Sequence, residues 1–226
     1  VALEIYKKLK IIFSDAESIT TTSGVTSDGL LYGWGGVSLY SYALYNILQD
    51  EEYISFAHEV LSYELEKLQE VEGMFLLKVK DERLMPYFSV GSAGLVIPLL
   101  LMKDFFDEEK VKSVLTGIEK TLLAKPCVCA GLFEGYVGLL YIAKYIDNYY
   151  KDKGIEKGYE KILKKNLSQY LLFDEDDKVY FPGNYSLRLS FDIATGLTGL
   201  LIYNCDYQNK FCWLPIVSQK ELFNLK

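Results

Sequence analysis

The sequence predicts an all-α protein, specifically an α/α toroid in which a layer of inner helices is surrounded by a layer of outer helices. Three helix-like runs that are apolar on nearly all sides are each followed by a helix that is apolar along one stripe. Such an alternation indicates two layers built from helical hairpins. Each inner run also begins at a Gly-x-x-Gly core, and the core occurs four times, as Gly33 and Gly36, Gly91 and Gly94, Gly135 and Gly138, and Gly196 and Gly199.

The predicted inner helices with a clear partner cover residues 37–48, 95–106 and 139–150. Glycine inside a helix costs about 1 kcal/mol relative to alanine, so its repeated use at these helix starts needs a reason. One alternative is that glycine permits close packing where helix ends crowd around one axis. The other is that it also leaves backbone N–H groups pointing into a central opening, where they favour anions.

The predicted outer helices cover residues 51–69, 108–123 and 155–170. Each has an apolar stripe at helical spacing, which is typical of a helix that covers a core on one side. Asp50 and Asp107 directly precede the first two of these helices and are predicted to be their N-caps.

Two connecting segments, residues 73–88 and 176–191, have extended patterns that predict short β-hairpins. We find no linker rich in Pro, Gly or Ser, so residues 1–226 are interpreted as one domain. The leading residues 1–13 predict the outer helix of a preceding repeat.

The composition excludes several classes of function. Half of the 226 residues are hydrophobic and the formal net charge is −7, which argues against nucleic acid as a partner. The longest uncharged apolar run, residues 93–102, is about half as long as a membrane helix. Four cysteines and the lack of a signal peptide in residues 1–20 predict a soluble, cytoplasmic protein without a membrane partner.

Four blocks of sequence carry a resemblance to a known family: "GLLYGWGGVSLYSYALYNILQDEEYISFAHEVL", "LMPYFSVGSAGLVIPLL", "CAGLFEGYVGLLYIAKYI" and "PGNYSLRLSFDIATGLTGLLIYN". Residues 24–216 resemble the lanthionine synthetase C-like family, and more narrowly the C-terminal cyclase domain of class III lanthipeptide synthetases. The family's toroid has seven inner helices, so the resemblance implies that this chain is the C-terminal portion of the domain, with about four of seven repeats. Kinase and lyase domains, with NTP and Mg for the kinase, would belong to missing upstream sequence.

The resemblance implies a reaction and its partners. A cysteine thiol of a ribosomal precursor peptide would add to dehydroalanine or dehydrobutyrine, forming a lanthionine or labionin ring. The partners would be that peptide, with its dehydrated core and its leader, and the kinase and lyase domains of the same synthetase. A non-catalytic scaffold domain of the synthetase is the main alternative. A glycoside hydrolase toroid is another, for which Glu134 and Asp192 would be the acid pair.

Zinc-dependent members of the family hold the metal through two cysteines and a histidine placed just before inner-helix glycines. The two residues before each first glycine are here Leu31 and Tyr32, Ser89 and Val90, Phe133 and Glu134, and Ala194 and Thr195. His58 lies in a predicted outer helix, where it is expected at the surface, and Cys127 and Cys129 are distant from Gly135. Cys205 and Cys212 lie near the other end of the fourth inner helix. We therefore expect no zinc and no other cofactor in this domain.

Without zinc, a general base or a lowered thiol pKa must supply the thiolate. Among the side chains beside the glycine pairs, Glu134 is the candidate base, with Tyr32 or Tyr136 as proton donor to the enolate. Candidate substrate-binding residues near the same glycines are Trp34, Ser89, Ser92, Arg188, Asp192, Thr195 and Thr198. Structural alternatives stay open: Glu134 can cap its helix, Trp34 and Tyr136 can be core aromatics, and Arg188 can pair with Asp192.

Overall fold

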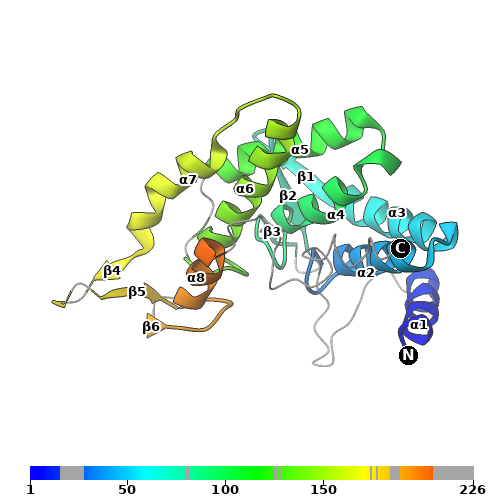
Figure 1. The fold of residues 1–226 in the computed structure, drawn as a ribbon, viewed down its shortest axis with the longest axis horizontal. Helices are drawn as coiled ribbons and strands as arrows, with labels where there is room; N and C mark the ends of the chain where they lie inside the picture. The colour runs from blue at the N-terminus through cyan, green and yellow to red at the C-terminus, as the bar shows by residue number, and fades with distance from the viewer. Residues whose placement is uncertain are drawn as a thin grey trace.

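A computed structural model gives the architecture shown in Figure 1. The described residues contain eight α-helices, three short 3-10 helices and two three-stranded sheets. None of these helices is long and apolar enough to cross a membrane. The structure describes residues 1–15, 28–79, 82–124, 127, 129–173, 175–176, 178–183 and 189–205.

The inner layer consists of α2 (Trp34–Leu48), α4 (Val96–Leu101), α6 (Tyr136–Asp152) and α8 (Leu197–Cys205). Consecutive members contact each other, α2 with α4, α4 with α6 and α6 with α8. Nearly all of α4 and the first half of α6 are buried, because these segments are apolar on every side. The predicted inner layer is therefore confirmed as a row of helices.

The outer layer consists of α1 (Ala2–Asp15), α3 (Glu51–Glu66), α5 (Glu108–Ala124) and α7 (Tyr159–Leu167). Helix α3 packs on α2, while α5 and α7 pack on α6. The two predicted N-caps are confirmed. The Asp50 carboxylate accepts from the amide of Glu52 at 3.0 Å, and the Asp107 carboxylate accepts from that of Glu109 at 2.8 Å.

Several predicted helix boundaries differ from the structure. The run 95–106 is divided into the 3-10 helix η1 (Ala93–Leu95), α4 and the 3-10 helix η2 (Lys103–Phe105). The helix predicted over 155–170 begins only at Tyr159 and ends in the 3-10 helix η3 (Ser168–Tyr170). A carboxylate on α6 fixes this start, since Asp147 accepts from the amides of Tyr159 and Glu160 at 3.0 and 2.8 Å.

The two predicted hairpins are antiparallel sheets of three strands. The first has β1 (Leu68–Val71), β2 (Met74–Lys78) and β3 (Leu84–Met85), and its first strand uses residues predicted to end the outer helix. The second has β4 (Leu172–Phe173), β5 (Val179–Pro182) and β6 (Leu189–Ser190). Both sheets connect an outer helix to the next inner helix, as predicted.

The core follows the inner layer. Its main cluster includes Leu30, Leu95, Leu132 and Tyr141, and a smaller cluster under α1 includes Trp34. Figure 1 shows the units following one another from α1 on the right to α7, α8 and the second sheet on the left. The described elements thus form a row of helical hairpins, and the closed toroid remains a prediction.

Candidate functional site

The segments that lead into the inner helices are four glycine loops, residues 28–36, 86–94, 130–138 and 191–199. The first glycine of each loop packs against backbone four residues earlier. A Cβ added to Gly33 would lie 2.5 Å from the Gly29 nitrogen, and one added to Gly196 would lie 2.7 Å from the Asp192 nitrogen. Any side chain would therefore force the loop open.

The second glycine of a loop packs against the preceding unit. A Cβ added to Gly138 would lie 2.8 Å from the Cβ of Phe88, and one added to Gly199 would lie 2.7 Å from that of Leu132. A Cβ added to Gly94 would likewise lie 2.8 Å from the Cβ of Leu30. The second, third and fourth Gly-x-x-Gly pairs therefore let each unit of the row approach the preceding one, which supports the packing alternative.

A ladder of backbone hydrogen bonds joins the four loops at equivalent positions. The amide of Leu31 donates to the carbonyl of Ser89 at 3.1 Å, and the amide of Ser89 donates to the carbonyl of Phe133 at 3.0 Å. The amide of Phe133 donates in turn to the carbonyl of Ala194 at 3.0 Å. Each of these residues lies two positions before the first glycine, so the loops are held in register along one surface.

Side chains on either side of this ladder differ in exposure. The residue just before the ladder residue is Leu30, Phe88 or Leu132 in the first three loops, where it is buried, and Ile193 in the fourth, where it is half-buried. The following residue is more accessible: Tyr32 is 43% exposed and Glu134 is exposed. We call the four residues that directly follow the ladder residues the mouth row. It consists of Tyr32, Val90, Glu134 and Thr195.

The alternative that helix-start N–H groups point into an opening does not hold for α6 or for the helical turn before α4. The amide of Tyr136 donates to the carbonyl of Cys129 at 2.9 Å, and that of Val137 donates to Ala130 at 3.0 Å. The same pattern precedes α4, where the donor and acceptor pairs are Ser92 and Met85, Ala93 and Pro86, and Gly94 and Tyr87. The second and third loops fold back onto their own helix starts, which satisfies the amides that would otherwise attract an anion.

Four predicted site residues lie in the interior. Trp34 is fully buried, with its ring 4.9 Å from that of Phe13, and the buried Tyr136 hydroxyl donates to the Leu163 carbonyl at 3.0 Å. These contacts support the alternative that Trp34 and Tyr136 are core aromatics. Ser89 and Ser92 are also fully buried, and their hydroxyls have no hydrogen-bond partner within the described residues.

The fourth glycine loop holds a local network around Asp192. Its carboxylate accepts from the amide and the hydroxyl of Thr195, both at 2.7 Å, and from the hydroxyl of Ser190. Burial opposes ionisation, but these hydrogen bonds lower the pKa of Asp192 to about 2. The Thr198 hydroxyl donates to the Phe191 carbonyl. Arg188 lies outside the described residues, so its predicted pairing with Asp192 stays a prediction.

Tyr87 is a candidate that the sequence reasoning missed. It occupies the position four residues before the first glycine, where the first and third loops have Gly29 and Gly131. Burial raises the pKa of the Tyr87 phenol, and the nearby Cys127, Cys129 and Glu134 raise it further. A tyrosine where two other loops have glycine is the signal that could have identified it.

The residues present do not fit the zinc site of zinc-dependent relatives. No Cys or His occupies the two positions before any of the four first glycines. Burial, with a smaller effect of Cys129, raises the pKa of the Cys127 thiol to about 12, whereas a metal ligand must be a thiolate. Within the described residues, no group of three or more His, Cys, Asp or Glu side chains could hold a metal ion.

Buried charges anchor the first glycine loop. Glu64 of α3 is fully buried, and its carboxylate accepts from the Gly29 amide at 2.5 Å and from the Lys67 ammonium at 3.0 Å. Lys67 also donates to Asp28 at 2.6 Å. Burial raises the pKa of Glu64, and the positive charge of Lys67 opposes this rise. The network ties an outer helix to the loop that carries Tyr32.

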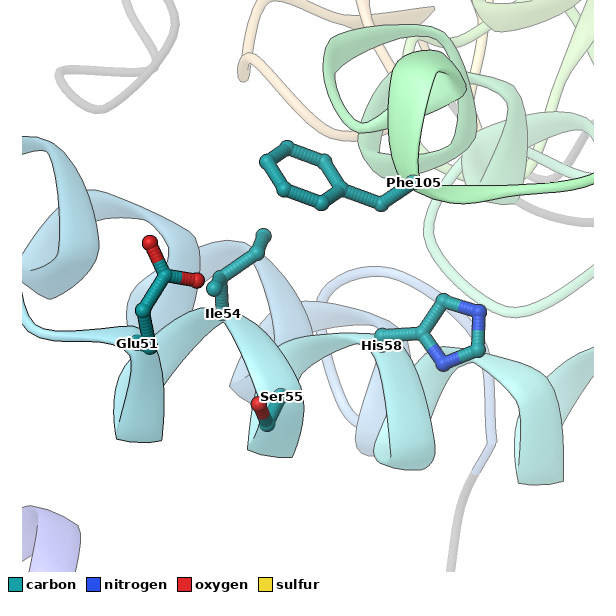
Figure 2. A pocket seen from close by; sticks show the side chains of 5 residues that line it. All are labelled: Glu51, Ile54, Ser55, His58 and Phe105. Atoms are coloured by element: carbon teal, nitrogen blue, oxygen red, sulfur yellow. The ribbon is translucent and has the colours of Figure 1, made fainter.

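The histidine lies away from the mouth row. His58 is half-buried on α3, where its ring lies tilted by 35° against that of Phe106 with the centroids 4.3 Å apart, so the expectation of a surface residue holds only in part. With Ile54, Phe105 and two polar residues of α3, it lines a pocket of about 280 Å³ (Figure 2). Phe105 follows the C-terminal end of α4, whereas the glycine loops precede the inner helices. This pocket is therefore separate from the candidate site.

Comparison with known proteins finds one matching family model and a similar protein. The family model described as "Lanthionine synthetase C-like protein" matches residues 9–216. The chain is also similar to the protein named "Probable SapB synthase" of Streptomyces coelicolor, with 25% identity over 183 residues. That match covers 77% of this chain and 18% of the relative, so the chain spans less than a fifth of the relative's length. The chain belongs to the lanthionine synthetase C-like family.

Proposed function

We propose that this chain is the cyclase domain of a class III lanthipeptide synthetase. It would close lanthionine or labionin rings in a ribosomal precursor peptide. Family membership across residues 9–216 supports a lanthipeptide cyclase-type role, and the similar protein is named a synthase. The relative is much longer than this chain, which leaves room in such a protein for the kinase and lyase domains that we propose as partners.

The observation that carries the proposal is the mouth row, which the backbone ladder presents along one surface. Glu134 is its carboxylate, with Tyr32 in the same row and Tyr87 close enough for the charge of Glu134 to raise its pKa. A peptide could therefore meet a base and two phenol donors on adjacent loops.

We assign the steps as follows. Glu134 accepts the proton of a peptide cysteine thiol while the sulfur bonds to the β-carbon of dehydroalanine or dehydrobutyrine. The electron pair of the C=C bond moves onto the adjacent carbonyl as an enolate. A phenol, from Tyr87 or Tyr32, protonates the α-carbon, and the protonated Glu134 returns a proton to that phenolate. The phenol proton thus ends on the α-carbon, and the thiol proton replaces it on the phenol, without an external oxidant or reductant.

The proposed reaction does not use zinc. The residues before the glycines lack the Cys and His donors, and the buried Cys127 thiol has a raised pKa. No other cofactor is proposed for this domain. We therefore expect chelator to leave the rate of ring closure unchanged.

The test uses the full-length protein that carries this chain and a precursor peptide already dehydrated at its serines and threonines. Ring closure consumes free thiols, so alkylation followed by mass spectrometry measures its rate. We expect Glu134→Gln to lower the rate about 100-fold or more, and Tyr87→Phe to lower it about tenfold or more. Tyr136→Phe is the matched control, because it removes a buried phenol that already donates to Leu163.

A non-catalytic scaffold is the second candidate function. The amides at the start of α6 are occupied by loop carbonyls, so they cannot stabilise an enolate without a change in the loop. A scaffold would bind the dehydrated peptide but leave ring closure at the uncatalysed rate. That result, together with no effect of Glu134→Gln, would contradict the cyclase proposal.

A further inference from the structure

The segment that leads into and through α7 differs in charge from the rest of the chain. Residues 151–165 contain six lysines and three acidic residues, whereas the whole chain has a net charge of −7. Three of these lysines lie on α7 and are exposed. We call Lys161, Lys164 and Lys165 the basic face.

A groove of about 450 Å³ lies beside this basic face and is lined by its three lysines and Glu160. Lys164 is partly neutralised, because it pairs with Glu160 at 3.1 Å and lies 5.3 Å from the Tyr203 ring centroid. Lys161 and Lys165 form no ion pair within the described part of the chain. They are four residues apart on one helix, so their Cβ atoms are about 5–6 Å apart on the same face.

The basic face belongs to the helix whose last turn lies near the start of α6. Helix α7 runs antiparallel to α6, because Asp147 holds its first amides and the Tyr136 hydroxyl donates to Leu163 in its second half. Figure 1 shows α7 beside α6. The last turn of α7, with Lys164 and Lys165, therefore lies toward the end of α6 that follows Glu134.

We propose that this groove binds an acidic segment of a peptide, with carboxylates spaced to meet Lys161 and Lys165. A short acidic peptide can pair with these lysines locally, whereas a long polyanion or an anionic membrane would also meet the chain's net negative charge. That the occupant is part of the peptide substrate rests on the proposed function. The bound segment would lie outside the reacting residues and hold them near the mouth row.

Direct binding tests this inference separately from ring closure. The probe is a short, fluorescently labelled glutamate-rich peptide, compared with the same peptide in which every Glu is Gln, and binding is followed by anisotropy. The full-length protein carries Lys161→Gln and Lys165→Gln together, and the matched control carries Lys110→Gln and Lys112→Gln at two exposed positions of α5. If the double variant unfolds at a lower temperature than the unsubstituted protein, the two single-substitution variants are measured in its place.

We expect the acidic peptide to bind more tightly than the Gln peptide, and the α7 variant to weaken its binding about five- to tenfold. The α5 control should change it less than twofold. No preference for the acidic peptide, or equal weakening by both variants, would overturn the proposal. Tighter α7-dependent binding to vesicles of anionic lipid or to an oligonucleotide would also overturn it. If rings close at the expected rate but the acidic peptide and the Gln peptide bind equally well, the proposed function stands and only this inference is lost.

Discussion

The first and fourth glycine loops have the same backbone arrangement but are held by different kinds of anchor. In the first loop, the fully buried Glu64 comes from α3 and binds the Gly29 amide and Lys67. In the fourth loop, the exposed Asp192 accepts hydrogen bonds from its own neighbours, including Thr195. In both cases the Gly-x-x-Gly pair permits the loop conformation. The anchor determines whether another element must fold first: α3 for the first loop, and none for the fourth.

Breaking the long-range anchor should have the largest effect on stability. We expect Lys67→Met to lower the free energy of unfolding by about 3 kcal/mol, because it leaves the buried carboxylates of Glu64 and Asp28 without a cation. Urea unfolding measures the change. Lys110→Met, at an exposed position of α5, is the control and should change stability by less than about 0.5 kcal/mol. Equal effects would contradict the proposed anchor.

Blocking the contact between units should have the next largest effect. Gly199→Ala should cost about 2 kcal/mol, since the new Cβ would lie 2.7 Å from the Leu132 Cβ and 2.8 Å from the Ile193 carbonyl oxygen. Gly154→Ala is the control, where φ is +76° but no atom lies within 4 Å, and should cost about 1 kcal/mol. Thermal unfolding of both variants gives the comparison, and a smaller loss for Gly199→Ala would argue against the contact.

The local anchor should have a smaller effect that depends on pH. Asp192→Asn should cost about 1 kcal/mol at neutral pH, which is typical of a lost capping carboxylate. The folded pKa of about 2 is below the unfolded value of about 3.9, so its contribution is complete above pH 4 and is lost as pH falls through 2. Unfolding measured between pH 5 and 2 should therefore show the two proteins converging in acid. A constant difference would show that ionisation is not involved.

An effect no larger than that of Asp192→Asn should come from loss of the Tyr136 hydroxyl. Tyr136→Phe removes its hydrogen bond to the buried Leu163 carbonyl and should cost about 1 kcal/mol. Tyr40→Phe, which removes a bond from an exposed hydroxyl to the Ala2 carbonyl, should cost less. If instead Tyr136→Phe leaves stability unchanged and abolishes ring closure, the assignment of Tyr136 to the core is wrong.

The layers of the fold could be predicted from the sequence because they depend on local periodicity. Runs that are apolar on all sides form inner helices, and runs with one apolar stripe form outer helices. Asp50 and Asp107 cap their helices as predicted. Boundaries failed where a distant group decides them. The carboxylate of Asp147 on α6 fixes the start of α7, and no pattern within 155–170 reports that contact.

The candidate site could be predicted only in part. Position relative to the glycines correctly suggested that Tyr32 and Glu134 are accessible. It could not show that Trp34 and Tyr136, which follow the glycine, turn into the core. The direction of each side chain depends on the ladder between loops, which joins residues about 40 to 60 positions apart in the sequence.

That ladder is the central claim, because it places the mouth row along one surface. Native-state hydrogen exchange measured by NMR tests it most directly. We expect the amides of Leu31, Ser89 and Phe133, which donate between loops, to exchange at least tenfold more slowly than those of Val90 and Glu134, which make no backbone hydrogen bond within the described residues. Equally fast exchange at all five amides would contradict the ladder, and with it the arrangement of the site.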